Sequence, residues 1–173
     1  MNKFNVKAIT LLELIITLLV FAIIAAFALP YYHNMMEQQE RNKVKMILLQ
    51  SLQMSRVQAQ SQHSNVVICP SLNGTTCDNG QWNTSIVIFR DSDNNRKIDP
   101  NEQIIDQQLL NLKYGNLSWR GARSTPSISF NTAQGLPIGY NGSFYYCSLH
   151  SSQHLRVVLS KMGHTRTEIL STC

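Results

Sequence analysis

Glycine is absent from the first 73 residues of this 173-residue chain, and Pro30 is the only proline before Pro70. Glycine and proline both interrupt helices, so this region lacks the usual stop signals. Small or hydrophobic side chains recur there at helical spacing, at Val44, Ile47, Leu48, Leu52, Ser55 and Ala59. We therefore predict one helix from about residue 10 to about residue 61, bent at Pro30 where a backbone hydrogen bond is lost.

Polar side chains are almost absent between Leu14 and Leu29, where Thr17 is the only one. Together with residues 11–13, this run reaches about 20 residues, which is enough to cross a bilayer as a helix. The residues before it are basic and lack acids, which is typical of an export signal whose positive charges stay in the cytoplasm.

Two interpretations of this apolar run compete. It could be a secretory signal that is removed, with a cleavage site among Ala25, Ala26 and Ala28. Glu13 favours a retained helix instead, because a carboxylate within an apolar segment is costly and has no role in a peptide that is discarded.

Sequence motifs of catalysis are also missing. The chain has no Gly-x-Ser-x-Gly and no His-Glu-x-x-His, and its five histidines and many serines fit solvated loops better than a catalytic set. We predict that the protein is not an enzyme and needs no cofactor. The net charge of +5 is a modest excess that is compatible with an anionic partner.

All four cysteines follow the apolar run, and none has the Cys-x-x-Cys spacing of a zinc site. An even number in an exported domain favours disulfides. Cys69 and Cys77 flank a short turn-rich loop, so we predict that they pair with each other. Cys147 is then left with Cys173, and this second bridge would hold the C-terminus against the domain.

From residue 65 onward the hydrophobic period changes to two and turn residues appear. We predict strands at residues 66–68, 85–89, 128–130, 143–146 and 155–159, with a short last one at 167–170. The predicted fold class is α+β, with a long helix whose second half packs on an antiparallel β-sheet domain.

The segment Ala8-Ile9-Thr10-Leu11-Leu12-Glu13-Leu14 resembles the class III signal of type IV pilins and type II secretion pseudopilins. The resemblance implies that prepilin peptidase cuts between Ala8 and Ile9 and methylates the new amino group of Ile9. Glu13 then stands at the fifth mature position, and Pro30 matches the proline that bends the family's helix. The sequence departs from the family where Ala8 replaces Gly and Ile9 replaces Phe or Met.

The rest of the chain resembles the GspH/FimT group of minor pilins, and the type IV pilin fold is implied. The resembling segments include Val67-Ile68-Cys69-Pro70-Ser71, the loop from Phe89 to Glu102, and Val157-Val158-Leu159-Ser160 before Gly163. The domains implied are a leader at 1–8, a transmembrane or filament-core helix at 9–30, its amphipathic continuation at 31–62 and a β-rich domain at 63–173. The resemblance places the chain in the bacterial inner membrane, with its C-terminal domain periplasmic, and after assembly in the extracellular pilus.

The partners implied are other minor and major pilins, prepilin peptidase and the inner-membrane assembly platform. Within such an assembly Glu13 has a definite role. A cleaved Ile9 carries a positive amino group inside the membrane, and a carboxylate about one turn away neutralises it and sets axial register. The alternative is that Glu13 lies at the membrane interface by accident of where the helix begins.

An acidic segment follows the strand predicted at 85–89. Asp91, Asp93, Asn95, Asp99 and Glu102 match the spacing of a calcium loop. Arg96, however, occupies the position where such a loop has glycine, and strands rather than helices flank it. We therefore favour an acidic hairpin loop without metal, with calcium coordination as the alternative.

Cations gather near the C-terminus, where Arg156, Lys161, His164 and Arg166 surround Gly163, with His150 and His154 nearby in sequence. The segment Gly163-His164-Thr165-Arg166 resembles the Gly-Arg-x-Arg motif by which FimT-type pilins bind double-stranded DNA, although His164 replaces one arginine. The alternative is a solvated hairpin. Tyr145, Tyr146 and Trp119 could stack on bases, but we expect them in the core.

Three functions follow from these patterns. The chain is a minor pilin that primes or caps a type IV pilus, or a minor pilin that also captures DNA for natural transformation, or a minor pseudopilin of a type II secretion system. The two predicted disulfides favour the pilus.

Overall fold

The computed structural model describes residues 11–122 and 124–173, so the predicted cleavage site at Ala8 and Ile9 lies outside the described residues. Helix α1 spans Leu11–Gln62, within about one residue of its predicted ends, and continues through Pro30. The chain divides into two compact units, Met1–Met36 and Glu37–Cys173. Helix α1 contributes to both units.

The described part of the first unit consists of helix alone. Its side chains from Leu11 to Leu29 are all exposed, including Phe21 and Phe27, which are 71% and 76% exposed. The helix is long and apolar enough there to cross a membrane. Large apolar side chains left in contact with water are unfavourable, so this segment requires an apolar environment.

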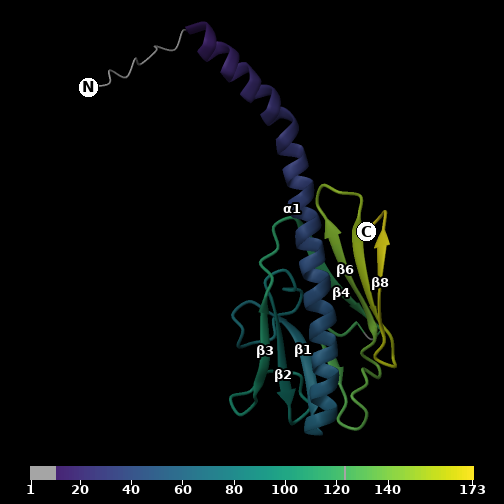
Figure 1. The fold of residues 1–173 in the computed structure, drawn as a ribbon. Coiled ribbons are helices and arrows are strands. Elements are labelled where there is room, and N and C mark those ends of the chain that lie inside the picture. The colour runs from purple at the N-terminus through teal and green to yellow at the C-terminus, as the bar shows by residue number, and fades with distance from the viewer. Residues whose placement is uncertain (1–10, 123) are drawn as a thin grey trace, which may run out of the picture. The chain divides into compact units, whose positions relative to one another are not determined.

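The described residues of the second unit form eight strands, most of which are labelled in Figure 1, in two antiparallel four-stranded sheets. The first sheet has the order β3-β2-β1-β5, and the second has the order β4-β6-β7-β8. The strands are β1 (Asn65–Ser71), β2 (Ser85–Asp91), β3 (Ile104–Leu109), β4 (Gly115–Gly121), β5 (Ile128–Phe130), β6 (Gly142–Ser148), β7 (His154–Leu159) and β8 (Thr165–Leu170).

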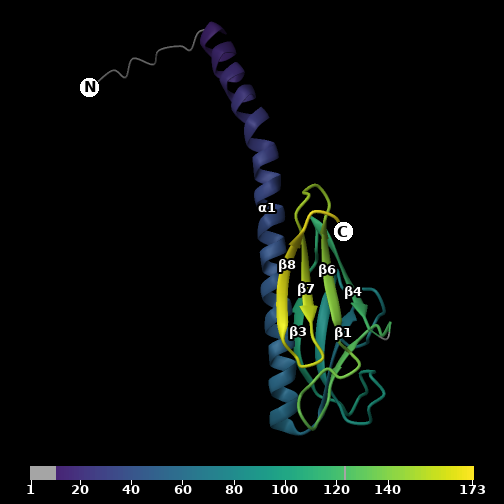
Figure 2. The same ribbon diagram turned by 90° about the vertical axis from the view of Figure 1, so that its right-hand side faces the viewer.

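Residues 37–62 of α1 lie along both sheets and share one core with them (Figure 2). The helix contributes Val44, Leu48, Leu52 and Ala59, four residues of the predicted apolar stripe. These residues pack with side chains from both sheets, among them Ile88, Phe130, Phe144, Tyr146 and Val157. The predicted α+β class, a long helix on an antiparallel domain, is confirmed.

The first sheet is covered on both faces. Ile68 and Ile88 face the core shared with α1, whereas Val67 and Phe89 belong to a second cluster on the opposite face with Cys77 and Ile98. Because both faces are buried, β1 and β2 are almost continuously apolar, and this is why the sequence revealed them.

The second sheet is covered on one face only. Phe144 and Tyr146 of β6 point into the core, whereas Tyr145 and Cys147, which alternate with them, are partly exposed. Strand β4 was not predicted, and neither was β3, whose residues all remain at least partly exposed at the edge of the first sheet. Edge strands carry weak hydrophobic alternation, which explains these misses.

Both predicted disulfides are present. Cys69 is joined to Cys77 with Cα atoms 5.6 Å apart, and Cys147 to Cys173 with Cα atoms 5.8 Å apart. The first closes the loop after β1, and the second ties the last residue of the chain to β6. The structure thus confirms a C-terminus held against the domain.

Candidate nucleic-acid interface

The four cations predicted to contact DNA lie on the β7–β8 hairpin. Arg156 is in the middle of β7, Arg166 is near the start of β8, and Lys161 and His164 are exposed in the connecting turn. Gly163 allows this turn because its φ is +74°, a conformation that costs glycine little. The hairpin therefore brings all four residues to one part of the domain.

Glu168 reduces the positive charge of this hairpin. Its carboxylate lies 3.4 Å from Arg156 Nη1 and 3.0 Å from Arg166 Nε. The Arg166 side chain is nevertheless 69% exposed, against 32% for Arg156. Arg166 therefore retains donors for a ligand, while Arg156 is largely committed to neighbours within the sheet.

The structure adds a residue that the sequence did not single out. Arg120 lies at the exposed end of β4, and its guanidinium carbon is 4.5 Å from the centroid of the Tyr145 ring. The Arg156 guanidinium carbon lies 5.4 Å from the same centroid. The expectation that Tyr145 is a core residue is wrong, because β6 alternates and Tyr145 falls on its outer face. The register of β4, had the strand been recognised, would have placed Arg120 beside it.

The other two aromatic residues contribute to the core. Tyr146 is fully buried, as expected, whereas Trp119 is partly buried and packs against the core on Phe144, with ring centroids 4.6 Å apart. The outer face of the second sheet thus offers one aromatic ring, which two guanidinium groups cover.

A shallow depression of about 520 Å³ lies on this outer face. It is lined by Arg120, Tyr145, Arg156 and Ser143, and by Lys161 in the turn after β7. No carboxylate is among its lining residues in the described part of the chain. The depression can therefore accommodate an anionic group.

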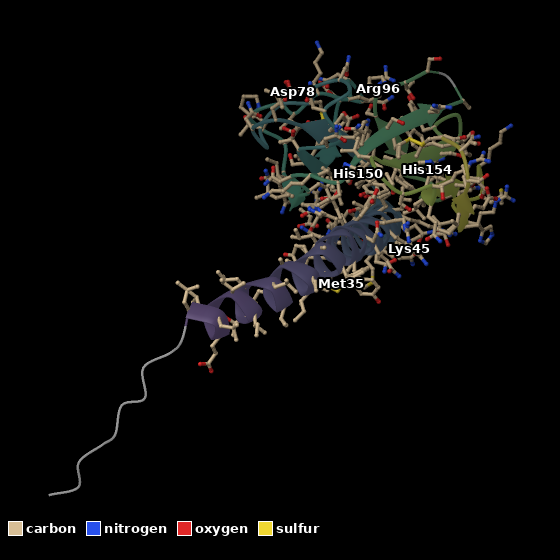
Figure 3. The ribbon with its side chains drawn as sticks, turned by 90° about the horizontal axis from the view of Figure 1, so that it is seen from above. Met35, Lys45, Asp78, Arg96, His150 and His154 are labelled. Carbon is tan, nitrogen blue, oxygen red and sulfur yellow. A yellow bond between two sulfur atoms is a disulfide. The ribbon has the colours of Figure 1, made fainter. Side chains whose placement is uncertain are left out.

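The two histidines near this region in sequence are not part of it. His154 begins β7, and its Nδ1 accepts a hydrogen bond from the Ser148 N–H at 3.1 Å. His150, which is labelled in Figure 3, lies in the β6–β7 loop. Its N–H donates to Glu37 Oε1 at 3.3 Å. Both belong to the end of β7 opposite the Gly163 turn.

Three charged residues of α1 hold this opposite end of the second sheet, and we call them the neck residues: Glu37, Glu40 and Arg41. Arg41 donates to the backbone oxygen and to Oε1 of Gln153 at 2.8 and 2.9 Å. Glu37 is 2% exposed and accepts from two N–H groups of the β6–β7 loop. Glu37 thereby accepts from donors of the β6–β7 loop, and Arg41 donates to acceptors of the same loop.

Glu40 makes the tightest set of these contacts. Its carboxylate accepts from the N–H groups of Lys113 and Tyr114 at 2.8 and 3.0 Å and from the Tyr146 hydroxyl at 2.8 Å. Burial raises the pKa of Tyr146 well above its usual value, and the hydrogen bond to Glu40 adds to the effect. Tyr146 therefore stays protonated and acts as a hydrogen-bond donor to Glu40.

The acidic segment forms the loop between β2 and β3. Both Asp91 oxygens accept backbone hydrogen bonds at 3.1 Å, from Asn95 and Arg96, and Glu102 accepts from the Ser92 N–H at 2.7 Å. Burial raises the pKa of Asp91, with Glu102 adding to the rise and the N–H bonds opposing it. The loop thus closes on its own carboxylates, and the favoured interpretation of an acidic hairpin loop without metal stays a prediction.

Calcium coordination stays a hypothesis. Oxygens of Asp91, Asp93 and Glu102 converge to within 4.8 Å of one another, while the Asn95 amide binds Asp93 and Asp99 at 2.7 and 2.6 Å. Arg96 adopts the left-handed φ of +61° that glycine favours at this position, and its guanidinium lies over Tyr140, 5.7 Å from the ring centroid. Arg96 and Asp78 lie on the side of the domain away from α1 (Figure 3).

The protein-family model described as type II transport protein GspH matches residues 47–163 of this chain, which is more than half of its length. The chain belongs to the GspH family. No curated protein sequence matches it.

Two solved structures share the fold of this GspH-family chain. The type IV minor pilin FimU of Pseudomonas aeruginosa is 14% identical, with a TM-score of 0.56 over 76% of this chain and 90% of FimU. The minor pseudopilin EpsH of the type 2 secretion system of Vibrio cholerae is 10% identical, with a TM-score of 0.52 over 75% of this chain and 97% of EpsH. The resemblance to minor pilins noted in the sequence is therefore confirmed at the level of family and fold.

Proposed function

We propose that this chain is a minor pilin that primes or caps assembly of a type IV pilus near its tip. One observation carries the proposal. The exposed apolar residues from Leu11 to Leu29 continue without a break into the helix that forms the core of the second unit. Such a helix is held by lipid before assembly and by neighbouring helices of the same kind in a filament.

In this proposal the helix spans the inner membrane, and the disulfide-bonded unit lies in the periplasm until assembly exposes it on the pilus. Disulfides fit that compartment because it is oxidising. Major and other minor pilins, prepilin peptidase and the assembly platform are the proposed partners. In this proposal the role of the chain is structural rather than catalytic, as for the relatives named above.

Sheared pili provide the test. Surface filaments should contain this chain at a low ratio to the major subunit, with immunogold label near fibre ends, and deleting its gene should reduce filament number. A chain that is absent from pili, whose deletion blocks protein secretion but not piliation, would instead establish the alternative of a minor pseudopilin.

A second function is favoured by the exposed cations of the β7–β8 hairpin. We propose that Lys161, His164 and Arg166, with Arg156 behind them, contact DNA outside the cell during natural transformation. Phosphate contacts by such residues weaken as salt rises. Gel-shift assays should show duplex binding by the full chain in detergent, with loss in Arg166→Ala. Absence of binding at low salt would refute this function.

A further inference from the structure

The outer face of the second sheet carries an unusual grouping of two arginines on one tyrosine. We propose that this grouping, the clamp formed by Arg120, Tyr145 and Arg156, is the principal phosphate-binding site for duplex DNA on this chain. The inference rests on the proposed DNA-binding function, and it moves the main contact from the β7–β8 turn to the face of the sheet.

Arg120 is the residue free to meet a ligand. It is exposed, and among the described residues no carboxylate forms an ion pair with it. Arg166 and Arg156, by contrast, share the Glu168 carboxylate. A phosphate approaching Arg120 therefore meets a cation whose charge no neighbouring acid offsets, at the rim of a depression without acids in its lining.

Tyr145 and Arg156 act as positioning residues. Arg156 is fixed by its bond to Ser143 Oγ at 3.2 Å and by Glu168, and it lies over the Tyr145 ring. The ring in turn lies under the Arg120 guanidinium. A guanidinium that packs on an aromatic ring loses rotamer freedom before the ligand arrives, so less entropy is lost on binding.

The same geometry predicts the kind of contact. A nucleobase would have to displace a guanidinium to stack on Tyr145, since two of them already lie over this ring. Arg120 is exposed, and Lys161 adds a second exposed cation to the lining of the depression. The clamp therefore suits backbone phosphates and not bases, and binding should be independent of sequence.

The test uses the full-length chain in non-ionic detergent micelles and a fluorescent duplex of mixed sequence, titrated at several salt concentrations. Arg120→Gln should weaken binding about five- to tenfold and lower the slope of log affinity against log salt by about one phosphate contact. Arg120→Lys should recover most of the affinity. Tyr145→Leu should weaken binding about threefold or more, whereas Tyr145→Phe, which keeps the ring, should not.

Lys97→Gln is the matched control, because Lys97 is an exposed cation in the loop between β2 and β3 of the other sheet. It should change affinity less than about twofold. Near-ultraviolet circular dichroism should confirm that each variant is folded. A duplex of unrelated sequence should compete equally.

The outcomes separate the two proposals. If Arg166→Ala abolishes binding while Arg120→Gln and Tyr145→Leu behave like the parent chain, the clamp is refuted and DNA binding by the turn stands. If the parent chain binds no duplex at low salt, the DNA-binding function itself fails. If heparin binds through Arg120 and the duplex does not, the site is one for another polyanion and the proposal is wrong.

Discussion

At the scale of single residues, Glu40 shows how one side chain can support several elements. Its carboxylate is bonded to two backbone N–H groups before β4 and to the hydroxyl of a buried tyrosine on β6. Hydrogen bonds to a charged acceptor are stronger than neutral ones, and removal of this carboxylate also leaves the hydroxyl of the buried Tyr146 unpaired.

We therefore expect Glu40→Ala to lower the free energy of unfolding by about 2–4 kcal/mol. Denaturation followed by the fluorescence of Trp82 and Trp119, the only two tryptophans, measures it. Gln39→Ala, an exposed neighbour on the same helix, should cost less than about 0.5 kcal/mol. Equal effects of the two substitutions would show that the contacts of Glu40 contribute nothing.

Tyr146 adds a dependence on pH. Its pKa in the folded protein lies above the usual value of 10.0, so the unfolded chain loses this proton first as the pH rises. The contribution is complete below pH 10 and declines above it, by about 1.4 kcal/mol per pH unit from this residue alone. Tyr146→Phe should abolish that part of the decline. Parallel stability curves for the two proteins between about pH 10 and 11 would contradict the assignment.

At the scale of elements, β8 is the edge strand of the second sheet, and a disulfide holds the chain just beyond it. Cys147 and Cys173 are 26 residues apart, and joining them restricts the unfolded chain. Replacing both by serine should cost about 3 kcal/mol and speed amide exchange in β8 more than in β1 or β2.

The Cys69–Cys77 pair is the natural comparison, because it closes a much shorter loop on the first sheet. Replacing that pair should speed exchange around the end of β1 and leave β8 unchanged. A uniform loss of protection across both sheets after either replacement would show that the bridges act only through global stability.

The same scale explains which elements the sequence revealed. Strands β1 and β2 are apolar on two faces, and α1 lacks glycine, so both signals are strong. Strand β4 reads Gly-Asn-Leu-Ser-Trp-Arg-Gly, where Leu117 is the one large side chain that is fully buried and Trp119 is partly buried, and this weak alternation concealed the strand. With β4 unrecognised, neither the division into two sheets nor the meeting of Arg120 with Tyr145 could be inferred.

The geometry of the candidate site also depends on strand pairing, which the sequence pattern does not show. The hairpin cations could be listed from the sequence because they surround Gly163, but their neutralisation by Glu168 depends on the register that sets Arg156 opposite it. Glu40 gave no signal at all, because a carboxylate on an amphipathic helix usually faces solvent.

At the scale of the whole molecule, the predicted N-terminal processing determines whether the mature protein keeps the apolar part of its helix. We expect the mature protein to begin with N-methylated Ile9, which mass spectrometry of the purified chain can establish. A mature protein that begins after Ala28 would contradict a retained helix.

Glu13 provides the companion experiment. Glu13→Ala should still be cleaved, since the change lies outside the predicted cleavage site, but its incorporation into filaments should fall at least severalfold because the amino group of Ile9 loses its counter-charge. Immunoblots of sheared pili measure this. Thr17→Ala is the matched control on the same helix, and equal amounts of all three chains in pili would refute the role of Glu13.

The order of strands has a consequence for export. Strand β5 completes the first sheet beside β1, yet it emerges only after β4 has begun the second sheet, and both sheets share a core with α1. In the proposed export across the inner membrane, neither sheet can complete its share of the common core while the rest of the chain is still crossing. The Cys147–Cys173 bridge likewise cannot form until Cys173 has crossed, and until then these thiols are open to the wrong partners. Cells that make this protein should thus depend on periplasmic chaperones and disulfide isomerases for its yield.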